Sequence, residues 1–584
     1  MRSRTYAALT VLILGTVYTQ HVATAQISGT DTTGSVRSAN EASSREGSAR
    51  AAGSGTELGA ADIIDEPTLR GHVRFLADDL LEGRGPGSRG DALTQLYLAT
   101  QFQTLGLIPA AADGGWLQPV PLVGVQTLAP PQVSFAAGDR SLTLQSVTEI
   151  MTSMGSPQIE ASIKDAEVVF VGYGIQAPEY EWDDFKDADL RGKILLMMNN
   201  DPADDPELFE GRRRLYYGRW DYKYESAARQ GAAGAIIIHS TPSAGYPWQV
   251  IQTSWSGEQF ELRDAAGPRL ELESWVTDEA AKKLVALAGK DLDQLRSAAE
   301  SREFRPQPLG VSLSVDLKAA IRMQNSANVL GMLPGSNPDL ADEVLIYMAH
   351  HDHLGMSAER DINSDNIYNG ALDNASGTAA LLAMAKAYSR LKVRPDRSIL
   401  FAAVAAEEQG LLGSQLFASD PPIPAGKMAA VINMDGTNFL GRTHDVNVIG
   451  LGKSSLDAHV REVAAAQGRI VTPDHFPDRG YYYRSDQFSL AKIGVPGIYL
   501  HSGLNVVGKP EGWGKQQLDE WVQNTYHQPS DEYREDWNLS GALEDTRLLF
   551  HVGRRIANAP TMPSWTAGDE FEAARLKAIS AAGL

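Results

Sequence analysis

The sequence predicts an α/β fold with a mixed, mostly parallel sheet flanked by helices, and a smaller β-rich unit inserted into it. Three short apolar segments have the length of buried parallel strands: residues 344–349, 399–406 and 429–434. A histidine, a pair of glutamates and an aspartate follow them, respectively. Because open α/β sheets bind ligands at the carboxyl ends of their strands, these side chains should meet at one sheet edge. The sequence therefore predicts a functional site at that edge.

The remaining elements follow in chain order. Apolar residues at helical spacing predict two helices, from Leu69 to Leu81 and from Leu93 to Leu105, joined by a Gly-rich turn. Arg84 and Arg89 in this turn would hold a partner domain or, as we favour, form salt bridges. Between residues 131 and 307 the pattern changes to short strands and turns. We expect strands at 166–174, 192–198 and 234–239, a helix at 222–231, an edge hairpin at 326–335, a helix at 378–391, a strand at 446–450, a helix at 456–466, a strand at 495–500, a loop at 503–519 and a closing helix at 548–557.

The first 25 residues have the pattern of a signal peptide cut after Ala25. Arg2 and Arg4 precede an apolar stretch, and a small-x-small sequence ends at Ala25. The apolar part is about 12 residues long, which is short for a membrane span, so an uncleaved anchor is less favoured. Residues 26–60 are rich in Ser, Gly, Ala and Thr and predict a disordered linker.

The composition limits which binding partners and which cellular compartment are expected for the protein. At 584 residues the chain predicts two or more folded units. Its formal charge is −21, and loss of Arg2 and Arg4 with the leader changes this to −23. Nucleic acid and anionic membranes are therefore poor partners, since both bind basic patches. The absence of cysteine excludes disulfides and a lipidated N-terminal cysteine, and favours a bacterial protein that is periplasmic or secreted.

Five motifs carry the chemistry of the chain. They are His350-His351-Asp352, the ten residues from Tyr368 to Gly377 (YNGALDNASG), the eight from Glu407 to Ser414 (EEQGLLGS), Asn433-Met434-Asp435 and the six from Tyr526 to Asp531 (YHQPSD). In this order they resemble the motif set of the M28 family of co-catalytic zinc exopeptidases. The resemblance extends from about residue 63 to 558. It implies a discontinuous peptidase domain at 61–130 and 308–560, a protease-associated (PA) domain inserted at 131–307, and a C-terminal tail at 561–584.

The resemblance implies a centre of two metal ions. The ligands would be His350, Asp373, Glu408, Asp435 and His527, which are too many for one catalytic zinc and suit two ions that share a carboxylate. By resemblance, Asp373 is the bridge, Glu408 and His527 hold one ion, and His350 and Asp435 hold the other. Three carboxylates against two dications leave a net charge of +1, which favours a bridging hydroxide. We expect two Zn²⁺, although cobalt or manganese suits the same donors.

Two residues would act on the substrate. Glu407 resembles the family's general base, and the alternative is an exposed acidic pair that caps a helix. Tyr526 directly precedes a ligand, as does a family tyrosine that donates to the oxyanion, and the alternative is simple packing.

Further residues would surround the centre. We expect Asp352 to accept the other N–H of His350 and Asp486 to lie behind the ligands. Tyr483, Arg484 and Ser485 are candidates for substrate binding. We expect His351 and His353 to be bystanders or rim residues. Arg479 and Arg484 would bind a substrate carboxylate or neutralise nearby acids, and Tyr246, Trp248 and Trp255 would form a rim or part of the core. The resemblance also implies a cis bond between Asp373 and Asn374.

The favoured function is an exported dizinc exopeptidase that acts on peptides as an aminopeptidase. A carboxypeptidase of the same family is the alternative. It would need arginines aimed at the terminal carboxylate, and its better-known members carry a helical dimerisation domain for which little chain follows Asp531. A receptor-like binding protein on the same fold would have lost ligands, whereas all five positions are filled here.

Overall fold

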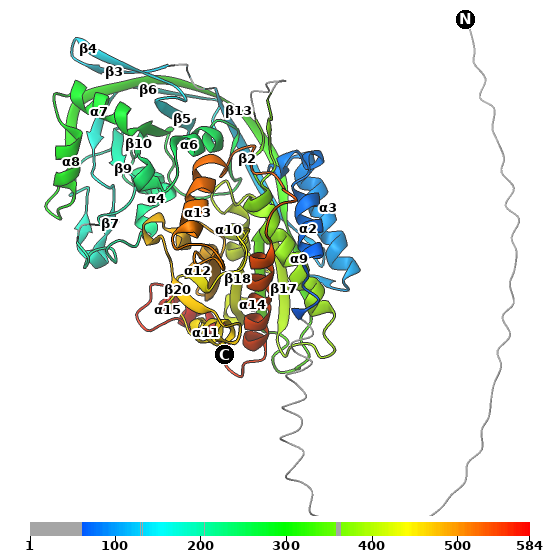
Figure 1. Ribbon diagram of the computed structural model, residues 1–584. Coiled ribbons are helices and arrows are strands. Elements are labelled where there is room, and N and C mark those ends of the chain that lie inside the picture. Colours follow the sequence, from blue (N-terminus) through cyan, green and yellow to red (C-terminus); the bar gives the residue numbers. More distant parts are fainter. Residues whose placement is uncertain (1–60, 129, 131, 204, 358–363) are drawn as a thin grey trace, which may run out of the picture. The chain divides into compact units, whose positions relative to one another are not determined.

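The computed structural model describes residues 61–584 except 129, 131, 204 and 358–363 (Figure 1). The predicted signal peptide and linker lie outside the described residues. Among the helices that are described, none combines the length and the apolar character needed to cross a membrane.

A parallel sheet, here called the main sheet, contains the predicted apolar segments. Its strands lie in the order β17 (Ser398–Val404), β14 (Val344–His350), β18 (Met428–Asn433) and β21 (Gly497–His501), all parallel. Every residue of β14, β17 and β18 is buried. Strands buried on both faces read as continuous apolar runs, which is why the sequence revealed them. The predicted α/β class is confirmed.

Antiparallel strands make the sheet mixed. On one side, β13 (Gln307–Leu333) pairs with β17, and both β1 (Ile108–Pro109) and β2 (Leu117–Leu128) pair with β13. On the other side, β19 (Asp445–Ile449) runs antiparallel to β21, and β20 (Ile470–Pro473) runs parallel to β19. A separate two-stranded ladder joins β15 (Gly355–Met356) to β16 (Ile367–Tyr368).

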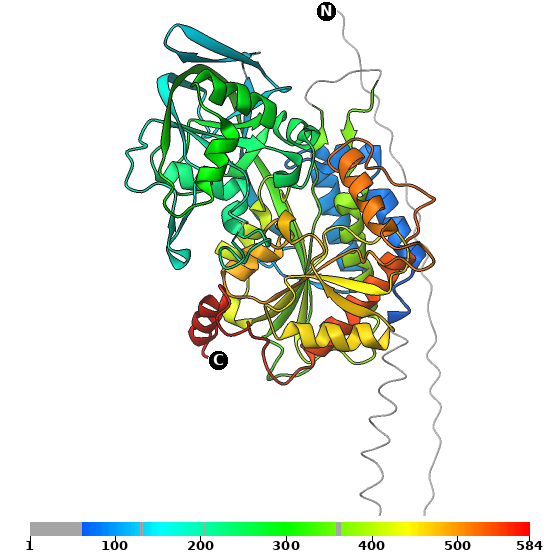
Figure 2. The ribbon, with the colours of Figure 1, turned by 60° about the vertical axis from the view of Figure 1, so that its left-hand side comes forward.

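Helices cover both faces of the main sheet (Figure 2). Because side chains alternate along a strand, Leu345 and Tyr347 face one side of β14 and Ile346 and Met348 the other. The first side packs against α2 (Glu66–Leu76), α3 (Arg89–Thr104), α9 (Ser376–Ser389), α11 (Leu456–Ala466) and α14 (Ser540–Ala557). The second side packs against α10 (Leu412–Ser419) and α12 (Gln487–Lys492). The helices predicted at 378–391 and 456–466 are confirmed, the first with a shift of two residues.

Residues 131–307, here called the insert, contain a second parallel sheet. Its strands lie in the order β6 (Glu160–Phe170), β9 (Ile194–Met198), β10 (Gly234–His239) and β12 (Leu272–Thr277), with β5 (Ile150–Met154) antiparallel beside β12. The strands and the helix predicted here are confirmed with shifted ends. The other elements are β3 (Gln132–Ala137), β4 (Arg140–Gln145), β7 (Gln176–Ala177), β8 (Trp182–Asp183), α4 (Trp220–Arg229), α5 (Thr241–Ala244), α6 (Trp248–Trp255), β11 (Gln259–Leu262), α7 (Asp278–Leu287) and α8 (Leu292–Ala299).

One strand, β13, joins the two sheets. Its first part pairs with β6 of the insert, its middle with β2 and its end with β17. The edge hairpin predicted at 326–335 is therefore wrong, because Leu309, Val311, Leu313 and further alternate residues are buried without an intervening turn. β13 instead runs straight through from the insert to the main sheet (Figure 1).

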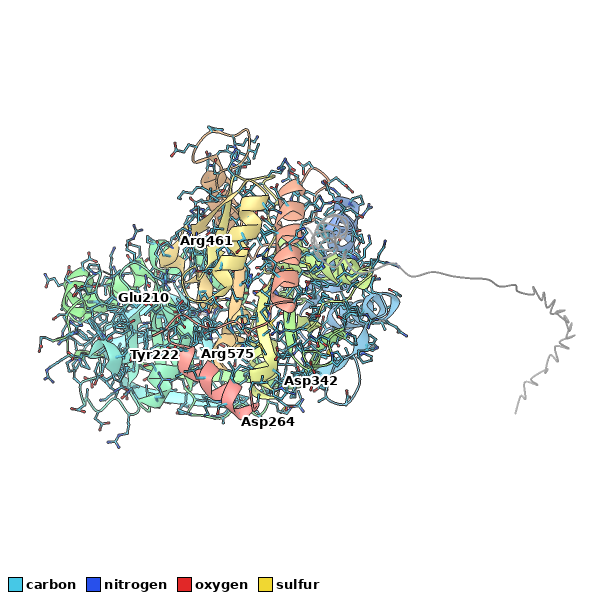
Figure 3. The ribbon with its side chains drawn as sticks, turned by 90° about the horizontal axis from the view of Figure 1, so that it is seen from below. Glu210, Tyr222, Asp264, Asp342, Arg461 and Arg575 are labelled. Carbon is cyan, nitrogen blue, oxygen red and sulfur yellow. The ribbon has the colours of Figure 1, made fainter. Side chains whose placement is uncertain are left out.

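The C-terminal part differs from the sequence prediction in two places. The loop expected at 503–519 contains the start of α13 (Trp513–Asn524), and the closing helix α14 begins at Ser540. The tail then forms α15 (Glu572–Ala581). Its buried Arg575, labelled in Figure 3, donates from Nη1 to the carbonyl oxygen of Met428 at 2.8 Å. The tail therefore packs against the start of β18.

Candidate metal centre

The structure brings the five predicted ligands together around Asp373. His350 Nε2 lies 3.3 Å from Asp373 Oδ1 and 3.3 Å from Asp435 Oδ1. His527 Nε2 lies 3.2 Å from Asp373 Oδ2 and 3.0 Å from Glu408 Oε2. Asp373 thus divides its two oxygens between two groups of donors. We call the group with His350 and Asp435 the first position and the group with His527 and Glu408 the second position.

The strand order explains this convergence. β14 lies between β17 and β18, with His350 opposite Val404 and Met348 opposite Asn433. His350 is the last residue of β14, while Glu408 and Asp435 lie just beyond the ends of the two neighbours. All three therefore lie at the carboxyl edge of the main sheet, as expected for a ligand site in an open α/β sheet.

The other two ligands come from loops that close over this edge. Asp373 lies in the turn before α9, and His527 follows α13. The bond between Asp373 and Asn374 is cis, as expected.

The donor set fits two divalent cations. Two imidazole nitrogens and three carboxylates are ligands that zinc accepts. Each imidazole presents one nitrogen to two carboxylate oxygens, and His527 Nε2 is buried without a partner in hydrogen-bond geometry. Buried carboxylates at this spacing repel one another unless cations compensate them. Bound cations would satisfy both the nitrogens and the charge.

Glu407 lies beside the centre but belongs to neither position. Its Oε2 is 4.0 Å from His350 Nε2, and its side chain is 10% exposed. Burial, reinforced by the charges of Asp435 and Glu408 and opposed by His350, raises the pKa of Glu407 well above its usual range. This carboxylate is therefore placed to exchange protons with a molecule in the centre.

Asp352 differs from its expected role. His350 Nδ1 lies 3.3 Å from the backbone oxygen of Asp352 and 3.8 Å from its Oδ1. The carboxylate instead accepts from the backbone N–H groups of Glu407 at 3.1 Å and Glu408 at 3.5 Å. Burial raises the pKa of Asp352 to about 8. Asp352 thus holds the Glu407–Glu408 segment, whereas its backbone orients His350.

Two supporting residues were not recognised from the sequence. Asp531 accepts from the N–H groups of Leu372 and Asp373, each at 3.0 Å, and so fixes the backbone at the bridging aspartate. Arg84 is buried and donates to three carbonyl oxygens beside the ligands, those of His351, Asn369 and Gly370.

The outcome for the two arginines of the Gly-rich turn is mixed. Arg84 braces backbone rather than forming a salt bridge or holding another domain. Arg89 is exposed and pairs with Glu82 at 3.2 Å. The only hint in the sequence was the position of Arg84 in that turn.

The second position has two further partners. His353, expected to be a bystander, places Nδ1 2.6 Å from Glu408 Oε1. Ser254 of α6 places its Oγ 2.9 Å from His527 Nδ1. His351 instead contacts the backbone oxygen of Ala327 through Nε2 at 3.1 Å. No sequence pattern pointed to Ser254, since it lies in the insert, far from the motifs.

Two cavities meet at Glu407. The first, about 840 Å³ up to its open mouth, contains Asp373 and Asp435 and has an apolar wall. The wall is formed by Leu372, Phe439, Leu518, Trp521 and Val522. The second lies on the Glu408 and His527 side and is lined by insert residues that include Arg219, Trp220, Ser254 and Trp255. Tyr246, Glu407, Arg484 and Tyr526 line both.

Tyr526 and Arg484 form the wall between the cavities. The Tyr526 ring lies 3.9 Å from that of His527, centroid to centroid, and its hydroxyl accepts from Arg484 Nη2 at 3.2 Å. The Arg484 guanidinium also lies over the rings of Tyr246 and Tyr481. The hydroxyl hydrogen of Tyr526 remains available to the cavity.

The other candidates lie outside the cavities. Tyr483 donates its hydroxyl to Glu570 at 2.7 Å, and Ser485 Oγ accepts from Asn433 Nδ2 at 2.6 Å. Asp486 is buried behind the ligands, where burial, opposed by His350, raises its pKa to about 6. Trp248 lines neither cavity and donates to Val147, so of the three aromatic residues expected at a rim or in the core, Tyr246 and Trp255 reach a cavity.

Comparison with curated proteins gives partial matches. The chain is 34% identical over 117 residues to the aminopeptidase NAALADL1 of rat (Rattus norvegicus). The aligned segment covers 19% of this chain and 14% of that protein. It is 31% identical over 190 residues to leupeptin-inactivating enzyme 1 of Streptomyces exfoliatus. This alignment covers 32% of this chain and 39% of that enzyme. The chain thus spans well under half the length of these relatives.

The fold and the family model agree with the geometry. An aminopeptidase from Aneurinibacillus sp. strain AM-1 superposes with a TM-score of 0.50 at 18% identity, over 87% of this chain and 97% of that one, which supports the fold. The model of peptidase family M28 matches residues 328–550, the segment that supplies all five converging ligands and Glu407. Residues 328–550 of this chain are therefore similar to peptidase family M28.

Proposed function

We propose that the chain is a metallo-aminopeptidase that releases N-terminal residues from peptides. The observation that carries the proposal is the convergence of five metal donors on Asp373, with the unligated Glu407 beside them at the junction of two cavities. The match of residues 328–550 to a peptidase family supports the reaction class.

Side chains around the centre supply the proton transfers. Two bound divalent cations would polarise the scissile carbonyl and lower the pKa of an attacking water. Glu407 takes the proton of that water and returns it to the leaving amine. Tyr526, whose oxygen already accepts from Arg484, donates its hydroxyl hydrogen to the developing oxyanion. Asp352 keeps Glu407 in place through its backbone.

The first cavity suits the N-terminal residue of a substrate. Asp373, Glu407 and Asp435 line this cavity, and bound cations would neutralise the two aspartates and leave Glu407 to attract an ammonium group. The apolar wall favours an aliphatic or aromatic side chain. We therefore propose that peptides with N-terminal Leu or Phe are better substrates than those with N-terminal Asp.

A carboxypeptidase is the second candidate, and Arg484 is the observation that favours it. This guanidinium lines both cavities, and its closest contacts are tyrosines rather than a carboxylate. Arginine binds carboxylates through a planar fork. Arg479 does not have this freedom, since it pairs with Asp519 at 2.8 Å.

Hydrolysis of two substrate sets separates the candidates. Leucyl and phenylalanyl p-nitroanilides should be cleaved by protein loaded with two equivalents of Zn²⁺, while N-blocked dipeptides with a free carboxylate should not. Cleavage of only the blocked dipeptides would replace the aminopeptidase by the carboxypeptidase. Fewer than two bound equivalents of metal, with hydrolysis of neither set, would support a receptor-like protein.

We also propose export. The support is the sequence pattern of residues 1–25, which lie outside the described residues. Sequencing the N-terminus of the protein purified from a bacterial periplasm or medium should show Gln26 first. A chain that retains Met1 would contradict this.

A further inference from the structure

Among the described residues, the insert hydrogen-bonds to a ligand of the second metal position and to neither His350 nor Asp435 of the first. Ser254 Oγ lies 2.9 Å from His527 Nδ1, and the backbone N–H of Phe260 donates to Gln409 Oε1 at 2.9 Å, directly after Glu408. The first contact is to a ligand of the second position, and the second is to the residue next to its other ligand in sequence. Within the described part of the chain, the hydrogen bonds of His350 and Asp435 all go to residues outside the insert.

Ser254 is held by the insert itself. Its carbonyl oxygen accepts from Gln259 Nε2 at 3.0 Å. The adjacent Trp255 packs edge-on against Trp220 and Trp275, with ring centroids 5.3 and 6.2 Å apart. Earlier in α6, the side chains of Trp248 and Gln252 donate to Val147. The serine hydroxyl therefore moves with the insert and not with the main sheet.

The geometry also fixes the direction of the bond. His527 Nε2 faces Asp373 and Glu408, so a metal ligated there requires this nitrogen unprotonated. Nδ1 then carries the hydrogen and donates it to Ser254 Oγ. Such a bond orients the ring and raises its basicity as a ligand. At the first position the corresponding acceptor for His350 Nδ1 is the backbone of Asp352.

We propose that Ser254 is a positioning residue through which the insert sets the metal affinity of the second position, while the first position is independent of the insert. The proposal rests on the proposed metal centre. It assigns the insert a part in building the site as well as in lining the cavities.

Metal affinity tests this without reference to turnover. Stepwise Zn²⁺ dissociation constants are measured by competition with a chromophoric chelator for the wild type and Ser254→Ala. One constant should rise by about 10- to 100-fold, the range found when partners of metal-ligating histidines are removed. The other should stay within about twofold, since its ligands do not contact the insert.

Combining Ser254→Ala with a second substitution at either metal position identifies the position whose affinity changes. In Asp435→Asn, which disables the first position, Ser254→Ala should weaken the metal that remains. In Glu408→Gln, which disables the second, the same change should have no effect. Equal weakening in both backgrounds, or none in either, would overturn the proposal.

Neighbouring variants control for misfolding. Thr253→Ala removes a hydroxyl that bonds within α6 to Gln249, and it should leave both constants unchanged. Ser254→Thr keeps the hydroxyl and should restore most of the affinity. If Thr253→Ala weakens zinc as much as Ser254→Ala, the effect is one of helix stability and the proposal fails. If the wild type binds no zinc, the proposed function fails first.

Discussion

Within the described residues, two parallel sheets both end in polar side chains, yet only the main sheet gathers a metal-type donor set. In the main sheet, β14, β17 and β18 lead into the ligands. In the insert sheet, β9 leads into Asp201 and β10 ends at His239. Both sets lie at the carboxyl edge of their sheet, where open α/β sheets bind ligands. Strand order alone therefore does not make a site.

The difference lies in what each polar group contacts. In the insert, Asp201 accepts from the N–H of Leu215 at 2.8 Å, and His239 Nε2 lies 3.1 Å from the carbonyl oxygen of Tyr246. The ammonium of Lys223 donates to the carbonyl oxygens of Tyr173 and Asn200. These groups are satisfied within the protein. In the main sheet the donors face one another across a cavity instead, which leaves room for cations.

The largest expected effect is on turnover at the main sheet. Glu407→Gln keeps the shape and both positions but removes the proton acceptor, so kcat should fall by about 10²- to 10⁴-fold. Zinc content, measured by atomic absorption, should remain at two equivalents. A variant that retains near-wild-type kcat would remove Glu407 from its assigned role.

A substitution at the carboxyl edge of the insert sheet should lower the unfolding free energy and leave turnover unchanged. Lys223 is fully buried, and burial lowers its pKa to about 7. Lys223→Met leaves the carbonyl oxygens of Tyr173 and Asn200 without their buried donor, which should cost about 1 to 3 kcal/mol of unfolding free energy. Urea denaturation measures this, and kcat/KM of the folded protein should stay within about twofold.

An exposed lysine provides the control for this change. Lys164 pairs with Asp316 at the surface, and Lys164→Met should cost less than about 1 kcal/mol. A large drop in kcat/KM for Lys223→Met would show that the insert edge also takes part in catalysis.

Metal removal should lower the unfolding free energy of the protein. A cation bound at a concentration 100 times its Kd adds about 2.7 kcal/mol to stability. Dialysis against a chelator should therefore lower Tm, and Zn²⁺ should restore it. The variant Asp373→Asn lacks the shared carboxylate, so its Tm should change little on treatment with the chelator or on addition of Zn²⁺. An equal chelator effect on wild type and variant would place the stabilising metal elsewhere.

The smallest expected effect is a pH dependence in the insert. Burial lowers the pKa of His239 from 6.5 to about 4. His239 therefore binds a proton more readily in the unfolded chain than in the folded protein. Its contribution to the unfolding free energy is complete above pH 6.5 and is lost as the pH falls toward 4. At pH 5 the loss is about 2 kcal/mol.

His239→Gln isolates that contribution. The amide keeps a donor for Tyr246 but does not titrate, so the variant should lose about 2 kcal/mol less than the wild type between pH 7.5 and pH 5. Urea midpoints at the two pH values measure this. Parallel losses in both proteins would assign the acid sensitivity to other groups.

Sequence patterns sufficed for the main sheet because its strands are buried on both faces. The segments before His350 and Asp435 read as apolar runs, the second interrupted by Asn433, and the motifs then gave the ligand set. The same patterns failed where local signals were ambiguous. In β13, residues 326–335 look like an isolated hairpin until the alternation upstream of Ser326 is followed back to Leu309.

The supporting residues were beyond local patterns. Ser254 acts through one hydrogen bond to a ligand far away in sequence, and Asp531 acts through hydrogen bonds from two backbone N–H groups. A lone serine or aspartate carries no periodicity, and its role follows only from which strands become neighbours. His353 was misjudged for the same reason, since only the fold shows that its ring reaches Glu408.

The continuous course of β13 ties the mechanical behaviour of the insert to that of the rest of the protein. A force that pulls the insert away acts along a strand bonded to β6, β2 and β17 in turn, so it loads several ladders in shear rather than opening a hinge. Melting one sheet removes a hydrogen-bonded neighbour from the strand that continues into the other. The two sheets should accordingly melt in one cooperative transition.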